Sequence, residues 1–130
     1  VSIGQGVIFE IANSGSLKIG DRCTLGDYTR YSTIDQITIG NAVAIAEQVS
    51  VRGSFHNTNR DQKIIDQGDY GEPILIGDDV LLGSQVVVLM GSTISEGAVI
   101  GAKSLVLKSD KVHPYGIFAG SPLKHIRDRK

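Results

Sequence analysis

The sequence contains very little of several residue types that mark common protein classes. It has one cysteine, one methionine, three prolines and no tryptophan. A single cysteine, Cys23, excludes an intrachain disulfide framework and fits a reducing compartment. No apolar run approaches the roughly 20 residues that a membrane span requires. We therefore expect a protein without disulfides and without a membrane span, located in the cytoplasm.

Charge of either sign is in no excess, because 13 basic residues stand against 14 acidic ones and give a formal net charge of −1. Binding to nucleic acid or to an anionic membrane usually needs a strongly positive face, so we expect neither partner. The first residues lack the basic segment and apolar core of a secretion signal. The length suits one domain with its own core, and we expect residues 1–130 to form it.

Glycine, at 16 residues, and the β-branched residues are what the sequence has in abundance. Apolar residues recur at every sixth position, in three phases that a two-residue slip and a long polar stretch separate. These positions are Ile19, Leu25, Tyr31, Ile37; Ile39, Ile45, Val51; and Ile76, Leu82, Val88, Ile94, Ile100, Val106, Val112. The next residue is often glycine, which we expect to relieve the backbone at a corner.

A period of six predicts a stack of triangular coils. Each hexad would be one short strand and a corner, and three hexads would close one coil. Neighbouring coils would pair as parallel strands about 4.8 Å apart, with apolar columns inside. No coil is then stable alone. The residue four places after each apolar position is usually small. Cys23 is one such residue, and we assign Cys23 to core packing. The predicted fold class is therefore all-β, a parallel β-helix of hexapeptide repeats.

Three residues do not suit the small inward position that the period assigns to them, namely Asp35, Phe55 and, near the end of the array, Asp110. Because a buried unpaired carboxylate is costly, Asp35 should lie where the coil is broken. The two-residue slip between Ile37 and Ile39 is close to it. A simple corner irregularity and a functional site would both produce this pattern.

Three segments fall outside the array. We expect residues 1–18 to be an N-terminal capping coil, residues 57–75 a protruding loop directly after His56, and residues 113–130 a short C-terminal segment. A loop as long as the second one is usually functional or disordered in a compact domain.

These features together resemble a known family. The array, the long loop after His56 and the ending 119-AGSPLKHIR-127 are similar to those of the hexapeptide-repeat acyltransferases. The likeness is greatest to the maltose/galactoside and polysaccharide-modifying sugar O-acetyltransferases, and segment 74–108 carries most of it. The resemblance implies a left-handed parallel β-helix and a homotrimer with active sites between subunits. It also implies acetyl-CoA as co-substrate, a sugar acceptor, a role in polysaccharide biosynthesis and no required metal.

The resemblance also implies roles for individual residues. His56 matches the family's general base, which would deprotonate the acceptor hydroxyl for direct attack on the thioester; an imidazole suits this task near neutral pH. Ser84 matches the position whose main-chain amide stabilises the oxyanion. Asp35 resembles an acidic contact to the acceptor. Contacts to coenzyme A, whose phosphates attract cations, are implied at Ala102, Lys108, Lys124 and Arg127.

Other functions use the same fold. N-acetylation of an amino sugar, serine acetylation and antibiotic acetylation would all employ the same base. A γ-class carbonic anhydrase needs histidine ligands on adjacent coils, and His113 and His125 lie instead in the terminal segment. A structural or ice-binding β-helix needs a repeated threonine face, which the sequence lacks. An acetyl-CoA-dependent O-acetyltransferase acting on a sugar or polysaccharide-precursor hydroxyl is the function that the sequence favours.

Overall fold

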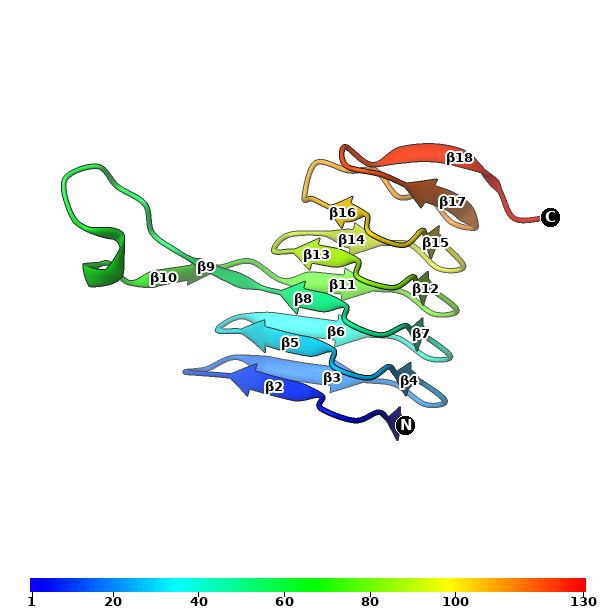
Figure 1. Cartoon of the computed structure of the whole chain (residues 1–130), viewed down its shortest axis with the longest axis horizontal. Helices are drawn as coiled ribbons and strands as arrows, with labels where there is room; N and C mark the ends of the chain where they lie inside the picture. Colours follow the sequence, from blue (N-terminus) through cyan, green and yellow to red (C-terminus); the bar gives the residue numbers. More distant parts are fainter.

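The computed structural model describes all 130 residues. Short strands wind into stacked coils with three faces, and one excursion extends from the side of the stack (Figure 1). The chain has one helix, the 3-10 turn η1 (Ile64–Asp66) in that excursion. No helix is long and apolar enough to cross a bilayer. The predicted all-β class and parallel coil are confirmed.

Three sheets make the faces of the coil, and we name them A, B and C in the order in which the chain visits them. Face A consists of β1 (Ser2–Ile3), β4 (Thr24–Leu25), β7 (Ala44–Ile45), β12 (Leu81–Leu82), β15 (Val99–Ile100), β17 (Gly116–Ala119) and the antiparallel β18 (Lys124–Asp128). Face B consists of β2 (Ile8–Ile11), β5 (Arg30–Thr33), β8 (Ser50–Arg52), β13 (Val87–Leu89) and β16 (Leu105–Val106). Face C consists of β3 (Ser16–Ile19), β6 (Gln36–Ile39), β11 (Ile74–Ile76) and β14 (Thr93–Ile94). A separate antiparallel hairpin joins β9 (Ser54–His56) and β10 (Asp69–Gly71).

Inward side chains stack in columns through the coils, as the period of six predicts. On face A the parallel register places four apolar residues one above another, each at most 2% exposed: Leu25, Ile45, Leu82 and Ile100. Full burial of one such side chain contributes about 1.5–3 kcal/mol. Because each residue is covered by its neighbours in the coils above and below, the burial exists only in the stack.

The corners depend on different residues from those that we expected. The glycines that follow the apolar positions do not have positive φ, whereas Arg22 (57°) and Gln85 (61°) do, each directly before a buried inward residue. Gly83 is needed for another reason. A Cβ at Gly83 would lie 2.7 Å from the main-chain nitrogen of Ala102 in the next coil. Such a glycine allows close approach of neighbouring coils and does not make the turn.

Every inserted residue lies at one edge, where the chain passes from face B to face C; we call this edge the BC corner. Paired residues are 18 positions apart in the regular fourth coil, as in Leu82 with Ile100. They are 20 apart in the second coil and 22 apart in the first, as in Leu25 with Ile45 and in Ile3 with Leu25. The third coil is longest, because the β9–β10 hairpin is inserted between β8 and β11.

The inward positions that we assigned to Asp35 and Phe55 are filled by other residues, so that assignment is wrong. Strand β5 continues beyond Tyr31, and alternation puts Thr33, 1% exposed, in the inward slot. Its Oγ1 accepts a hydrogen bond from the Asp35 amide at 2.9 Å. In the next coil the buried Gly53 fills the slot, because the chain then turns outward into β9. Asp35 does lie at a break in the coil, as expected.

The first coil occupies one end of the stack. Its inward residues are partly exposed, Ile3 at 56% and Phe9 at 44%. The Phe9 ring stacks on Tyr31 of the second coil, with ring centroids 5.5 Å apart. Phe9 thus extends the inward column of face B from the second coil to the first.

A titration of the core tests this arrangement. Burial raises the pKa of Tyr31 from 10.0 to about 12, and its hydroxyl has no hydrogen-bond partner. The folded state therefore favours the neutral phenol, and the associated stability is present below about pH 10 and is lost as the pH rises through about 12. We expect Tyr31→Phe to reduce this alkaline loss in denaturant unfolding. Tyr28→Phe, at an exposed tyrosine, is the control, and an equal alkaline loss in both variants would contradict the assignment.

Candidate active site

The β9–β10 hairpin leaves the β-helix at the BC corner (Figure 1). His56 is the last residue of β9. The antiparallel register places His56 directly opposite Asp69 of β10. His56 Nδ1 lies 3.1 Å from Asp69 Oδ1, and both side chains are open to solvent. A carboxylate at Nδ1 orients the imidazole and leaves the Nε2 lone pair directed outward. The pair has the geometry of a general base with its orienting carboxylate.

Sequence reasoning missed Asp69. The loop contains four carboxylates, and their spacing from His56 does not distinguish them: Asp61, Asp66, Asp69 and Glu72. Only the pairing of β9 with β10 brings one of them to the imidazole.

A polar pocket of about 230 Å³ lies beside His56, between the hairpin and the outer surface of face B. Its floor includes Glu10, Ser32 and Arg52, which stand in register on β2, β5 and β8. Arg30 forms an ion pair with Glu10 at 3.0 Å. Arg52 has no ion pair, and its buried Nε has no hydrogen-bond partner. The lining offers many hydrogen-bonding groups, as a hydroxyl-rich ligand requires.

Phe55 divides this pocket from a second one. The second pocket, of about 600 Å³, is mainly apolar and includes Tyr70, Leu89, Met90 and Leu107. Phe55 lines both pockets, and the guanidinium carbon of Arg52 lies 5.7 Å from its ring centroid. Asp35, the predicted acceptor contact, lines neither pocket; it lies at the foot of the hairpin, where a Cβ at Gly71 would be 3.2 Å from its own Cβ.

Ser84 and Ala102 lie at a different edge, the AB corner, where the chain passes from face A to face B. The Ser84 carbonyl accepts a hydrogen bond from the Lys103 amide at 2.8 Å, whereas the Ser84 amide has no acceptor within the chain. The Ser84 hydroxyl donates to Glu47 and so holds the pKa of that carboxyl below its usual value. The AB and BC corners are opposite edges of face B, so one chain does not bring His56 and Ser84 together.

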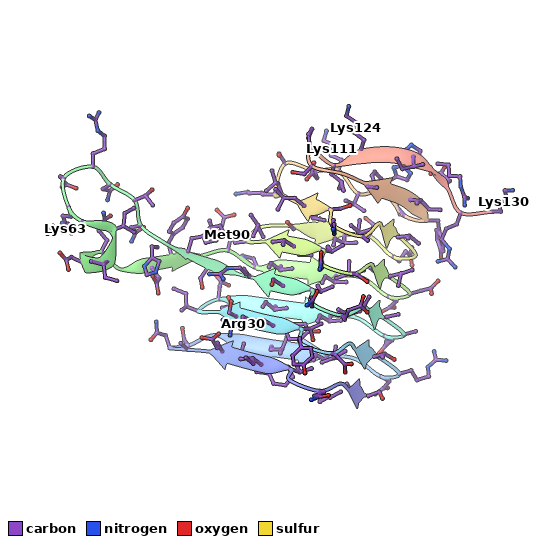
Figure 2. The ribbon with its side chains drawn as sticks, in the orientation of Figure 1. Arg30, Lys63, Met90, Lys111, Lys124 and Lys130 are labelled. Carbon is purple, nitrogen blue, oxygen red and sulfur yellow. The ribbon has the colours of Figure 1, made fainter.

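The predicted coenzyme contacts lie on three parts of the chain. Ala102 is exposed at the AB corner. Lys108 lies at the BC corner of the fifth coil, with its Nζ 2.9 Å from Glu72 Oε2. Lys124 and Arg127 are exposed on β18 at the C-terminal end of the stack, where Lys124 projects away from the coils (Figure 2).

A second group of titratable residues occupies the C-terminal segment. His113 Nε2 and His125 Nε2 lie 2.8 Å and 2.7 Å from the same oxygen, Asp128 Oδ1. Hydrogen bonds from His113 and His125 hold the pKa of Asp128 below its usual value. This group is separate from His56, which stands on the hairpin of the third coil.

Comparisons with known proteins identify relatives of this chain. No family model matches it. It is 33% identical over 120 residues to a Mycobacterium tuberculosis protein named as a probable acetyltransferase, covering 92% of this chain and 39% of that one. It is 38% identical over 93 residues to the galactoside O-acetyltransferase of Escherichia coli, covering 71% of this chain and 44% of that one. The chain thus spans less than half the length of these two relatives.

Two solved structures match nearly the whole fold. A maltose O-acetyltransferase of Clostridium difficile matches 99% of this chain and 70% of its own, with a TM-score of 0.81 and 24% identity. A hexapeptide-repeat acetyltransferase of Vibrio cholerae, complexed with acetyl coenzyme A, matches 98% of this chain and 70% of its own, with a TM-score of 0.80 and 25% identity. The sequence of this chain is therefore similar to those of named acetyltransferases, and its fold matches that of hexapeptide-repeat acetyltransferases. These matches confirm the expected parallel β-solenoid of hexapeptide repeats.

The AB corner can be tested without an activity assay. In Ser84→Ala the hydroxyl that donates to Glu47 is removed, so the pKa of the Glu47 carboxyl should rise toward its usual value. Carboxyl chemical shifts measured against pH would follow this change. Ser95→Ala, at another corner of the coil, is the control. An unchanged Glu47 titration in Ser84→Ala would mean that the two side chains do not meet.

Proposed function

We propose that this chain is an acetyl-CoA-dependent O-acetyltransferase that acts on a hydroxyl of a sugar or polysaccharide precursor. The observation that carries the proposal is the His56–Asp69 pair at a polar pocket, at the point where the hexapeptide coil is interrupted. The named relatives support the reaction class. The acetyl coenzyme A bound to the Vibrio cholerae protein supports the donor.

The chemistry follows from the imidazole. His56 Nε2 takes the proton of the acceptor hydroxyl while the hydroxyl oxygen attacks the thioester carbonyl. Asp69 stabilises the imidazolium that forms. The tetrahedral intermediate then collapses, the carbon–sulfur bond breaks, and the departing coenzyme A thiolate receives the proton from His56. No covalent enzyme intermediate is needed, which leaves the buried Cys23 with a packing role.

The oxyanion of the intermediate needs a hydrogen-bond donor. The free main-chain amide of Ser84 supplies one, and the Ser84 side chain is not required. Because Ser84 and His56 stand at opposite edges of face B, the complete site needs the His56 hairpin of one subunit and the AB corner of another. This geometry requires more than one subunit, and because the family resemblance implies three, we propose a homotrimer with active sites between subunits. Light scattering of the purified protein measures this assembly directly.

Coenzyme A would lie along the AB corner and the C-terminal strand. Ala102, in the turn at the AB corner, would offer main-chain groups to the pantetheine arm, and Lys124 and Arg127 would bind phosphates. Because Lys108 stands at the opposite BC corner, it would contact a coenzyme bound to the AB corner of a neighbouring subunit, after exchanging its ion pair with Glu72 for a coenzyme phosphate. The acceptor would occupy the polar pocket beside His56, and Asp35 at the foot of the hairpin remains a candidate contact.

The same base would also serve amino-sugar, serine or antibiotic acceptors. A panel of such acceptors with acetyl-CoA, followed by free thiol release, tests the proposed sugar class. Faster thiol release with sugars than with the other acceptors supports the proposal. Faster thiol release with another acceptor class would assign that class as the acceptor and leave the proposed acetyl transfer unchanged. An absence of release with the whole panel contradicts the proposal.

Substitutions at the His56–Asp69 pair test the mechanism. His56→Ala should lower kcat by about 10²–10⁴-fold, the usual contribution of a general base. Asp69→Asn keeps the shape of the side chain but removes its charge, so kcat should fall less than in His56→Ala while the KM for acetyl-CoA stays constant. Asp61→Asn, on the same excursion but without an ion pair, should retain wild-type kinetics. Near wild-type transfer by an intact His56→Ala assembly would exclude the mechanism.

Substitutions on β18 test coenzyme binding separately. Combined Lys124→Ala and Arg127→Ala should raise the KM for acetyl-CoA by about tenfold, because each charge-assisted hydrogen bond is worth about 1.5–3 kcal/mol before solvent exposure reduces it. The acceptor KM should change less. Lys18→Ala, at an exposed lysine of β3, is the matched control. An equal rise in both KM values would assign these residues to general stability instead.

A further inference from the structure

Three potential metal ligands converge at the C-terminal end of the stack. His113, His125 and Asp128 each direct one donor atom to a common point, and these atoms all lie within 4.8 Å of one another. The two imidazole Nε2 atoms approach the same carboxylate oxygen, and the imidazole centroids are 4.7 Å apart. The coenzyme and acceptor roles proposed above use none of these three side chains.

The fold brings these residues together by a specific irregularity. His113 follows Val112, which makes the last bridge of face C, and β18 then folds back antiparallel on β17. Side chains alternate along a strand, so His125 and Asp128, three residues apart, would normally lie on opposite faces of β18. The β17–β18 register shifts at Ile126, which is left unpaired, and this bulge brings both side chains to one face.

A buried aromatic ring supports both imidazoles. Phe118 is 5% exposed, and its ring centroid lies 5.1 Å from that of His113 and 5.2 Å from that of His125. Asp128 is paired with Gly116 across the hairpin, so its backbone is also held by the β17–β18 ladder. Because three donors from two segments, the corner at His113 and strand β18, are already oriented, a ligand that joins them would meet a preformed site.

We propose that His113, His125 and Asp128 bind a divalent transition-metal ion of the zinc type. Two imidazole nitrogens and one carboxylate oxygen suit Zn²⁺, Co²⁺ or Ni²⁺, whereas Mg²⁺ and Ca²⁺ prefer sets of oxygen ligands. Each imidazole would bind through Nε2 as the Nδ1–H tautomer. Metal–ligand bonds of about 2.0–2.2 Å would require the three donors to move only slightly around the ion.

The bound ion would have a structural effect. It would join the corner residue His113 to β18, the strand that carries Lys124 and Arg127. Because an ion that binds only the folded state adds to its stability, Zn²⁺ should raise the melting temperature. The proposal concerns a site distinct from His56, and its outcome does not depend on acetyl transfer.

Calorimetric titration of the whole chain with zinc chloride, and absorption spectra with Co²⁺, test the site. We expect one ion per chain and cobalt d–d bands that indicate nitrogen and oxygen ligands. His125→Asn and Asp128→Asn should each weaken binding by at least about tenfold, as loss of a ligand does. The chain has one other histidine, so His56→Asn is the matched control and should bind metal as the wild type does.

Melting curves provide a second measurement if a variant is less stable. Zinc should raise the melting temperature of the wild type and of His56→Asn, and should raise that of Asp128→Asn by less at the same zinc concentration. The proposal is wrong if the wild type binds no zinc at equimolar concentrations, if the double variant His113→Asn/His125→Asn still binds it, or if His56→Asn removes binding. If the wild type binds no zinc, the three residues serve only as a hydrogen-bonded contact between the His113 corner and β18.

Discussion

The stacking of inward apolar side chains is the constraint on which the rest of this molecule depends. Each coil is too short to bury its own residues, and the covering surface is always the next coil. Leu82, for example, is sealed by Ile45 on one side and Ile100 on the other. A residue inserted on a face would displace every later side chain from its column. Insertions are therefore restricted to corners, where the backbone can leave the stack and return in register.

The long insertion at the BC corner meets this requirement by pairing with itself. β9 and β10 form their own ladder, and the Asn57 amide donates to the Gly68 carbonyl at 2.9 Å. At the foot, the Glu72 amide donates to the Gly53 carbonyl at 3.2 Å. These bonds hold the two ends of the excursion together, and face C resumes at β11 in register with β6. The hairpin can therefore vary without disturbing the columns.

The period of six was sufficient to predict the coil, because alternation and burial on the faces are local consequences of the sequence. The prediction failed where a repeat was longer than six residues. Thr33 and Gly53 occupy the inward positions that the period assigned to Asp35 and Phe55. The reasons are that β5 continues to Thr33 and that the chain leaves the stack after β8. His56 was predictable by its position at the end of the array. Asp69 was not predictable, because it lies thirteen residues after His56 and meets it only through the register of the β9–β10 hairpin.

The C-terminal hairpin shows the same limit for a different reason. In the sequence, His113 and His125 are isolated residues in a terminal segment, and the regular coil offers no position where they would meet. Their meeting depends on the reversal after β17 and on a single unpaired residue in β18. A terminal strand also exposes the edge of face A, and such edges invite pairing with other chains. The exposed charged residues of β18 oppose that pairing, so the same strand can protect the edge while it presents cations and imidazoles to ligands.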